Sequence, residues 1–237
     1  MNFYIGLHHP NDARLFPRAC LSINVLRSRK KPIDCPEVMV DSGAFTELAL
    51  HGGYRHPPEE YAVELWRLHK EGVVRIHAAV AQDYMCEPFI LKKTGLTVAE
   101  HQRLTIERYD RLRPVAPPFH IMPVLQGFTP QEYVSHIRQY GRRLLPGMWV
   151  GVGSVCKRNS DPKQIADVLS AIHCARSDLR LHGFGLKKTA LKNPLVFWLL
   201  HSADSMAWSF HARKNGKDAN GPGEALKFAE DIQAVFR

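Results

Sequence analysis

The sequence predicts an α/β fold, and within that class a single (β/α)8 barrel of the TIM type over residues 1–237. Short apolar runs rich in β-branched residues alternate with longer stretches of helical periodicity, which is typical of parallel strands joined by crossover helices. The number of runs is close to the eight strands that a closed barrel needs. No long linker, repeat or low-complexity tract interrupts the alternation, so one domain is expected.

Seven of the short apolar runs are predicted as strands because β-branched residues dominate them and turn residues bound them. They are residues 3–7, 38–40, 75–81, 120–125, 148–153, 179–184 and 202–206. A weaker run over residues 21–26 is the candidate for an eighth strand.

Helices are predicted between these runs from periodicity and from their starting signals. Thr97 followed three positions later by Glu100 has the pattern of a capping box. Pro130 and Pro162 suit the first turn of a helix. The predicted helices are residues 58–71, 97–112, the one that 129–132 opens, 165–175 and 223–236.

Polar residues and glycines gather where five of the apolar runs end. In parallel α/β folds the carboxyl ends of the strands face the active site. Five such endings are harder to explain by stability than a single one, so we expect a functional site at this rim. The five segments are Asp41-Ser42-Gly43, Gln82-Asp83, Gln126-Gly127, Gly151-Val152-Gly153-Ser154 and Gly183-Phe184-Gly185.

Basic residues are in excess, with 32 Lys and Arg against 23 Asp and Glu and a formal net charge of +9. The excess is clustered in residues 27–31, 138–143, 187–192 and 211–217. Because basic clusters gain free energy by displacing counterions from phosphates, this pattern favours a polyanionic partner. A basic surface without a partner is the alternative.

The cysteines and the hydropathy pattern exclude several classes of protein. The five cysteines are scattered, so we expect neither a disulfide framework nor a cysteine-rich zinc site. His8, His9 and His182 lack the paired spacing of metal ligands, and neither a metal nor a cofactor is predicted. No apolar run approaches the roughly 20 residues of a membrane span, and the N-terminus lacks a signal-peptide pattern, so a cytoplasmic location is expected.

Asp41, Asp83 and Asp204 each lie at the carboxyl end of a predicted strand, so a barrel can bring them to one cavity. Converging carboxylates suit chemistry at an anomeric carbon, where one attacks or stabilises the carbon and another moves a proton to the leaving group. The alternative for each aspartate alone is that it caps the following turn.

Nearby residues suit the binding of a flat heterocycle. The Gln126 amide offers donors and an acceptor in one plane. Gly151 and Gly153 allow the backbone to approach a ligand closely. Phe45 and Tyr84 could stack on a ring, although aromatic side chains more often belong to a core.

Five segments resemble motifs of the tRNA-guanine transglycosylases, and they occur in the order of that family. Residues 40–45 are similar to its Asp-Ser-Gly-Gly-Phe segment, and residues 124–127 to its Val-Gln-Gly segment. Residues 81–83 resemble the segment of the second aspartate, and residues 150–154 the Gly-Gly loop that contacts the base. Residues 203–208 resemble the Phe-Asp-Ser-Ala-x-Tyr run of archaeal members, which carries the nucleophile.

Departures from this family separate the chain from the tRNA-modifying members. Ala44 replaces the second glycine, and the Cys-x-Cys-x-x-Cys zinc segment and the additional RNA-binding domains of archaeal members are missing. Residues 209–213 replace the Pro-Thr-Arg run that contacts the anticodon. A compact, zinc-free barrel of this type resembles the DpdA group, the deazapurine DNA-modification transglycosylases of bacteria and phages.

The resemblance implies exchange of guanine in DNA for a free 7-deazaguanine base such as preQ0. It implies that Asp204 is the nucleophile of a covalent aspartyl-glycosyl intermediate and that Asp41 transfers the proton. The residues expected to bind the base are Ser42, Phe45, Asp83, Gln126, Gly127, Gly151, Gly153 and Gly185. The candidates for contact with the nucleic-acid backbone, from their charge, are Lys187, Arg213, Lys214 and Lys217.

Three alternatives remain open at this point. The same chemistry could act on tRNA, the barrel could be an inactive binder of nucleic acid or a protein, or it could be a glycosidase or nucleoside hydrolase. Retention of Asp41, Asp83 and Asp204 argues against the inactive barrel, since a pure binder of polyanions has little use for such carboxylates. The sequence does not say whether a helicase or ATPase partner opens the duplex.

Overall fold

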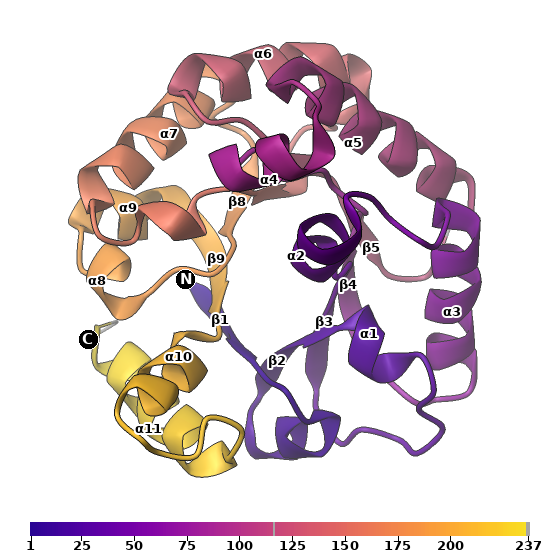
Figure 1. Ribbon diagram of the computed structural model, residues 1–237, viewed down its shortest axis with the longest axis vertical. Helices are drawn as coiled ribbons and strands as arrows, with labels where there is room; N and C mark the ends of the chain where they lie inside the picture. The colour runs from indigo at the N-terminus through magenta and orange to yellow at the C-terminus, as the bar shows by residue number, and fades with distance from the viewer. Residues whose placement is uncertain (116, 236–237) are drawn as a thin grey trace.

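The computed structural model describes residues 1–115 and 117–235, and in these residues nine parallel strands form one sheet that is rolled into a barrel (Figure 1). The predicted domain of residues 1–237 and the predicted helix of residues 223–236 therefore extend beyond the described part. The strands are β1 (Asn2–Gly6), β2 (Arg18–Ser22), β3 (Glu37–Asp41), β4 (Ile76–Val80), β5 (His120–Met122), β6 (Val124–Leu125), β7 (Trp149–Val152), β8 (Arg180–Gly183) and β9 (Leu200–Ser205).

The strands follow one another around the barrel in chain order, and β9 pairs with β1. β5 and β6 are the two halves of the strand predicted over residues 120–125, which Pro123 interrupts because proline has no N–H to donate. The Met122 carbonyl accepts from Ala81 N at 3.0 Å and the Pro123 carbonyl from Gly151 N at 2.8 Å. The broken strand thus joins β4 to β7, and the predicted (β/α)8-type barrel is confirmed.

Helices surround the sheet, while α2 and α4 lie across one end of the barrel (Figure 1). None of the helices in the described part of the chain has the length and apolar character that crossing a membrane requires. The helices are α1 (Ile23–Leu26), α2 (Ala44–Thr46), α3 (Pro58–Lys70), α4 (Pro88–Thr94), α5 (Val98–Leu112), α6 (Pro130–Tyr140), α7 (Pro162–Ala175), α8 (Lys188–Leu191), α9 (Pro194–Leu199), α10 (Ala207–Lys214) and α11 (Pro222–Val235).

Local capping signals set the beginnings of the outer helices. The capping box predicted from Thr97 and Glu100 begins α5, and Thr129 and Glu132 form a second one at the start of α6. Pro162 opens α7, as expected for a proline in a first turn. These helix starts depend only on neighbouring residues, and the structure confirms them.

The eighth strand was predicted incorrectly in its second half. Residues 21–26 have the pattern of a strand, whereas β2 ends at Ser22 and Ile23–Leu26 form α1. The Ser22 hydroxyl accepts a hydrogen bond from Asn24 N at 3.3 Å and so caps the helix. Ile23 and Leu26 are buried, which explains why a short helix looks as apolar as a strand.

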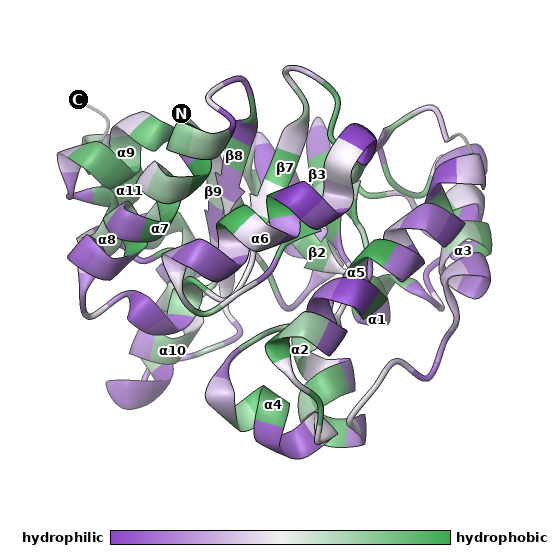
Figure 2. Ribbon diagram, turned by 90° about the horizontal axis from the view of Figure 1, so that it is seen from above, coloured by the Kyte–Doolittle hydropathy of each residue, from purple (hydrophilic) through white to green (hydrophobic). Residues whose placement is uncertain are grey.

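Apolar side chains fill the described part of the fold on both sides of the sheet. The larger group lies between the strands and the outer helices, whose bands of apolar and polar residues are visible in Figure 2. A second group comes from strands β1 to β7 and fills the barrel interior. Its buried members are Tyr4, Cys20, Met39, Ala78, Val80, Met122, Val124 and Trp149.

Candidate active site

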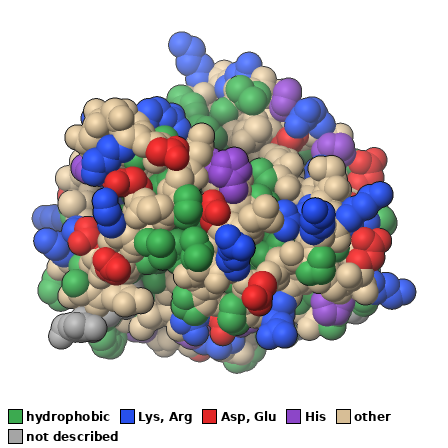
Figure 3. Space-filling view, turned by 90° about the horizontal axis from the view of Figure 1, so that it is seen from below, with side chains coloured by type: hydrophobic (Ala, Val, Ile, Leu, Met, Phe, Trp, Pro, Cys, Tyr) green, Lys and Arg blue, Asp and Glu red, His purple; other side chains and the backbone are tan. Residues whose placement is uncertain are grey.

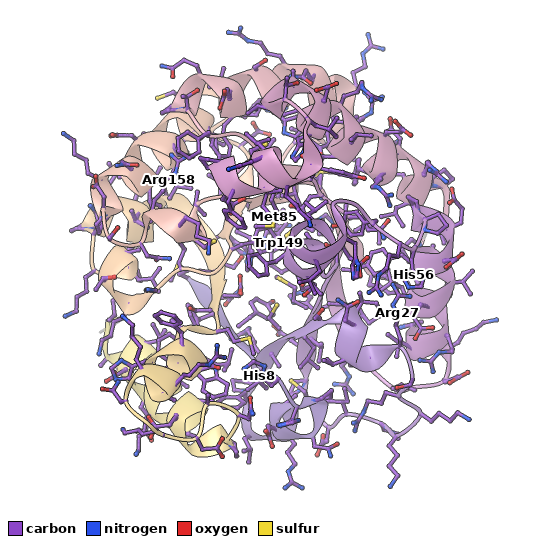
Figure 4. The ribbon with its side chains drawn as sticks, viewed as in Figure 1. His8, Arg27, His56, Met85, Trp149 and Arg158 are labelled. Carbon is purple, nitrogen blue, oxygen red and sulfur yellow. The ribbon has the colours of Figure 1, made fainter. Side chains whose placement is uncertain are left out.

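A cavity of about 610 Å³ opens at the carboxyl ends of the strands. Residues in or just after every strand except β5 line it. Its volume falls in the range of small-molecule sites. Figures 1 and 2 show α2 and α4 beyond this end of the barrel, and Figure 4 shows Met85, which lines the cavity, over the barrel centre near Trp149. The rim predicted from the sequence therefore surrounds a cavity.

Asp204, in β9, has one carboxylate oxygen held by donors. His182 Nε2 lies 3.2 Å and Gly185 N lies 3.1 Å from Asp204 Oδ1. Within residues 1–115 and 117–235, no donor lies within hydrogen-bond distance of Oδ2. The side chain is 13% exposed and lines the cavity. Two donors on one oxygen orient the carboxylate and leave the other oxygen for a ligand.

The donor His182 is itself oriented from the barrel interior. Trp149 Nε1 donates to Ser202 Oγ at 2.7 Å, and Ser202 Oγ lies 2.9 Å from His182 Nδ1. A neutral histidine that donates from Nε2 to Asp204 needs a donor at Nδ1, and the Ser202 hydroxyl supplies one. A buried chain of hydrogen bonds therefore sets the position of the Asp204 carboxylate.

Asp41, at the end of β3, combines capping with a place in the cavity. Its Oδ2 accepts a hydrogen bond from Gly43 N at 2.9 Å. Gly43 has φ +78°, and a Cβ there would lie 2.6 Å from Asn24 Nδ2, so the turn requires glycine. Burial raises the pKa of Asp41 to about 6; the charge of Asp204 adds to the rise and the Gly43 N–H opposes it. A carboxyl that titrates near neutral pH can both donate and accept a proton.

Asp83 and Gln126 form a polar pair on the cavity wall. Gln126 Nε2 donates to Asp83 Oδ2, and Ser42 Oγ donates to Asp83 Oδ1 at 3.5 Å. Burial raises the pKa of Asp83 to about 7; the Gln126 hydrogen bond opposes this rise and the charge of Asp41 adds to it. A carboxylate next to an amide offers acceptors and donors in one plane, which suits the edge of a heterocycle.

Behind this pair lies a buried carboxyl group, Glu87. Ser154 Oγ lies 2.7 Å from Gln126 Oε1 and 2.9 Å from Glu87 Oε2, and it accepts from Cys86 N at 2.8 Å. Ser154 has one hydroxyl hydrogen for two acceptors, Gln126 Oε1 and Glu87 Oε2, so both contacts together require either a proton on Glu87 or a turned Gln126 amide. Burial raises the pKa of Glu87, whereas the Ser154 hydrogen bond and the charge of Lys157 oppose the rise. Ser154 has φ +56°, and these bonds hold it in that unusual conformation.

The structure separates the predicted base-binding residues into two groups. Ser42, Gly127 and Gly151 do not line the cavity: Ser42 contacts Asp83, Gly127 packs against α6, and Gly151 leaves room for the Phe184 ring. They support the cavity wall. The predicted catalytic and base-binding residues that line the cavity are Asp41, Phe45, Asp83, Gln126, Gly153, Gly185 and Asp204.

The four predicted backbone-binding residues lie beside the cavity. Lys187 and Lys214 line an adjoining groove of about 600 Å³ next to α10 and α11. Lys217 Nζ lies 3.3 Å from Glu224, and Arg213 is exposed on α10. All four are on the side of the barrel where β8 and β9 end.

Sequence reasoning missed Glu87 and the roles of Ser154 and His182. Glu87 directly precedes the proline that opens α4, where an acidic residue is typical of a helix start. Its partner Ser154 is 67 positions away, so no local pattern shows that the two meet. Tyr84, a candidate for stacking, is buried in the core group of Leu48 and does not line the cavity.

No group of three His, Cys, Asp or Glu side chains among the described residues could hold a metal ion. His8 lines the cavity, and its Nε2 lies 2.8 Å from Ser209 Oγ. The cysteines, all in the described part of the chain, are free thiols.

The fold and the site define a (β/α)8-type barrel protein with acidic groups in a cavity at the carboxyl ends of its strands, where barrel enzymes carry their active sites. A family model described as DpdA, DeoxyPurine in DNA protein A, matches residues 1–229 of the 237. The chain belongs to this family, which acts in deazapurine modification of DNA. No curated protein matches the chain.

Proposed function

We propose that this protein exchanges guanine in DNA for a 7-deazaguanine base such as preQ0, through a covalent intermediate on Asp204. The observation that carries the proposal is the single cavity that Asp41, Asp83 and Asp204 share. Membership of the DpdA family supports DNA as the substrate.

In the first step, Asp204 Oδ2 attacks C1′ of the target nucleotide. The bond from C1′ to the base breaks, and the leaving guanine takes the electron pair and a proton from Asp41. The pKa of about 6 that burial imposes on Asp41 suits this transfer near neutral pH. The product is a glycosyl ester of Asp204.

In the second step, a free deazaguanine enters the same cavity and attacks C1′. It loses its proton to Asp41 while the ester bond to Asp204 breaks, so both carboxyl groups return to their starting states. Guanine and its 7-deaza analogues share the same Watson–Crick edge, and Asp83 and Gln126 form a matching set of acceptors and donors. One cavity can therefore bind the leaving and the incoming base in turn.

The test is incorporation of labelled preQ0 into a DNA oligonucleotide, followed by mass spectrometry of the nucleosides. Wild-type protein is expected to incorporate the label, and Asp204→Asn and Asp204→Ala are expected to lose at least about 10³-fold in rate. Asp167→Asn, an exposed position on α7, is the matched control and is expected to retain the wild-type rate.

Each component of the proposal can fail separately in this assay. Unchanged exchange by Asp204→Asn contradicts the nucleophile assignment. Label in tRNA and none in DNA moves the substrate to tRNA. Release of guanine without an incoming base identifies a hydrolase.

A further inference from the structure

The exposed phenylalanines are concentrated at the cavity end of the barrel. Among the described residues four phenylalanine side chains are at least 44% exposed, and each lies on a segment that follows the carboxyl end of a strand. Single exposed apolar residues are ordinary on a soluble protein. Four of one type on one end of the fold require an explanation. They are Phe45 on α2, Phe89 on α4, Phe128 after β6 and Phe210 on α10.

A lysine lies over two of these rings on one side of the cavity. The centroids of Phe45 and Phe89 are 6.1 Å apart, and Lys157 Nζ lies 5.4 Å and 5.3 Å from them. Phe45 also lines the cavity itself. This pair of rings is therefore continuous with the site where the base is exchanged.

The two remaining rings, Phe210 and Phe128, repeat the arrangement. Lys187 Nζ and Lys214 Nζ lie 5.4 Å and 5.3 Å from the Phe210 centroid. Arg158 Cζ lies 4.8 Å from the Phe128 centroid. A cation within about 6 Å of a ring is attracted by its face, so each exposed ring is paired with a positive charge.

No ion pair in the described part of the chain neutralises these four cations. Within the described residues, none of Lys157, Arg158, Lys187 and Lys214 forms an ion pair, whereas ten other lysines and arginines do. Figure 3 shows basic and acidic side chains interspersed on a face beside the cavity end. In addition, Arg158 is only 8% exposed and its Nε has no hydrogen-bond partner. Positive charge that no ion pair neutralises is complementary to phosphates.

We propose that these rings and cations bind an unpaired strand of DNA, with the bases beside the target nucleotide stacked on the phenylalanines and the phosphates held by the lysines and Arg158. Only unstacked bases present their faces to a protein, and stacking on aromatic rings is the common means of binding single strands. Paired duplex offers its base edges and phosphates and leaves such rings without a partner. The inference rests on the proposed function and specifies its substrate as single-stranded or locally opened DNA.

The test compares binding of a fluorescein-labelled 15-nucleotide DNA strand with binding of the same sequence as a duplex, by fluorescence anisotropy at constant salt. Wild-type protein is expected to bind the single strand at least about tenfold more tightly than the duplex. Phe89→Ala and Phe210→Ala are each expected to weaken single-strand binding by about 5- to 100-fold, and Phe210→Trp is expected to retain it. Trp198→Ala is the matched control, because Trp198 is 70% exposed on α9 and does not line the cavity.

Equal affinity for single strand and duplex overturns the inference, as does an equal loss with Trp198→Ala. Tighter binding of RNA of the same sequence overturns the assignment to DNA. Thermal unfolding of each variant shows whether weaker binding comes from the missing phenylalanine ring or from a disrupted fold.

Label incorporation measured on the same preparations separates this inference from the proposed function. If the protein prefers single strands through its phenylalanines but the wild type shows no exchange, the inference on single-strand binding stands and the proposed transglycosylase activity fails. If the wild type exchanges the base and neither Phe89→Ala nor Phe210→Ala slows the exchange, the proposed transglycosylase activity stands and the inference on single-strand binding fails.

Discussion

Alanine at Gly153 would put a methyl group where the Gln126 amide lies. A Cβ there would be 2.6 Å from Gln126 Cδ and 2.9 Å from Oε1, and closer still to Nε2. The backbone cannot easily yield, because Gly153 N donates to the Leu125 carbonyl at 2.9 Å and the Gly153 carbonyl accepts from Tyr133 Oη at 2.7 Å. Cδ must therefore move by about 0.8 Å, the difference between 3.4 and 2.6 Å, and Nε2 must move farther, before the amide reaches ordinary contact.

That displacement separates Gln126 from both of its partners in the site, Asp83 and Ser154. Two buried hydrogen bonds, one of them to a carboxyl group, hold the amide in place with about 2–3 kcal/mol together, which sets an upper limit of roughly 30- to 150-fold on the affinity for the base that correct placement of the amide can supply. In the proposed function Gln126 contacts the base edge in both steps, so we expect the loss mainly in the KM for the free base.

The assay is steady-state exchange with the concentration of the free base varied. Gly223→Ala, in α11, is the control because its Cβ would meet nothing within 4 Å. Combining Gly153→Ala with Gln126→Ala shows whether the methyl group acts through the amide, in which case the second change adds little. A wild-type KM for Gly153→Ala, or fully additive losses in the double variant, would refute the reasoning.

Three further changes test the groups around the cavity. Burial raises the pKa of Asp83 from 3.8 to about 7, so the folded protein binds this proton more tightly and loses stability as pH rises through that range. Asp83→Asn should therefore raise the free energy of unfolding, measured with urea, by roughly 1–3 kcal/mol at pH 8 and by little at pH 4. Equal effects at both pH values would contradict the explanation that a buried charge destabilises the folded protein. Glu87→Gln keeps a donor toward Ser154 and should change the KM for the base by less than about threefold. Glu87→Ala removes the side-chain hydrogen bond and should raise this KM about tenfold. A larger effect of Glu87→Gln than of Glu87→Ala would show that Glu87 acts as a carboxylate. His182→Phe removes a donor to Asp204 and should lower kcat by about 10- to 100-fold with little change in KM. A wild-type kcat would mean that Gly185 N alone suffices to orient the Asp204 carboxylate.

Much of the fold was predictable because its signals are local. The strand runs and the capping box of Thr97 and Glu100 involve residues within a few positions of each other, and both are present in the structure. The failure at residues 23–26 has the same origin. A buried four-residue helix and a buried strand have the same apolar composition, and the hydrogen bonds from Asn24 N to Ser22 and from Arg27 N to the Ile23 carbonyl distinguish them.

The candidate site was predictable only in part. Asp41, Asp83 and Asp204 could be identified because each follows an apolar run. Gly151 and Gly185 looked alike in sequence, yet one leaves room for the Phe184 ring while the other donates to Asp204. Which neighbour a glycine accommodates depends on the strands packed around it.

By itself the sequence determined the barrel, the acidic residues at its strand ends and the order of the family motifs, because these features belong to single segments. Only the tertiary structure decided that Glu87 lies behind Ser154 and Gln126, and that His182 holds Asp204. It also decided the raised pKa values of Asp41 and Asp83. Burial results from side chains that approach from many parts of the chain at once, so the removal of water that shifts these carboxyl groups is a property of the assembled cavity and of no segment alone.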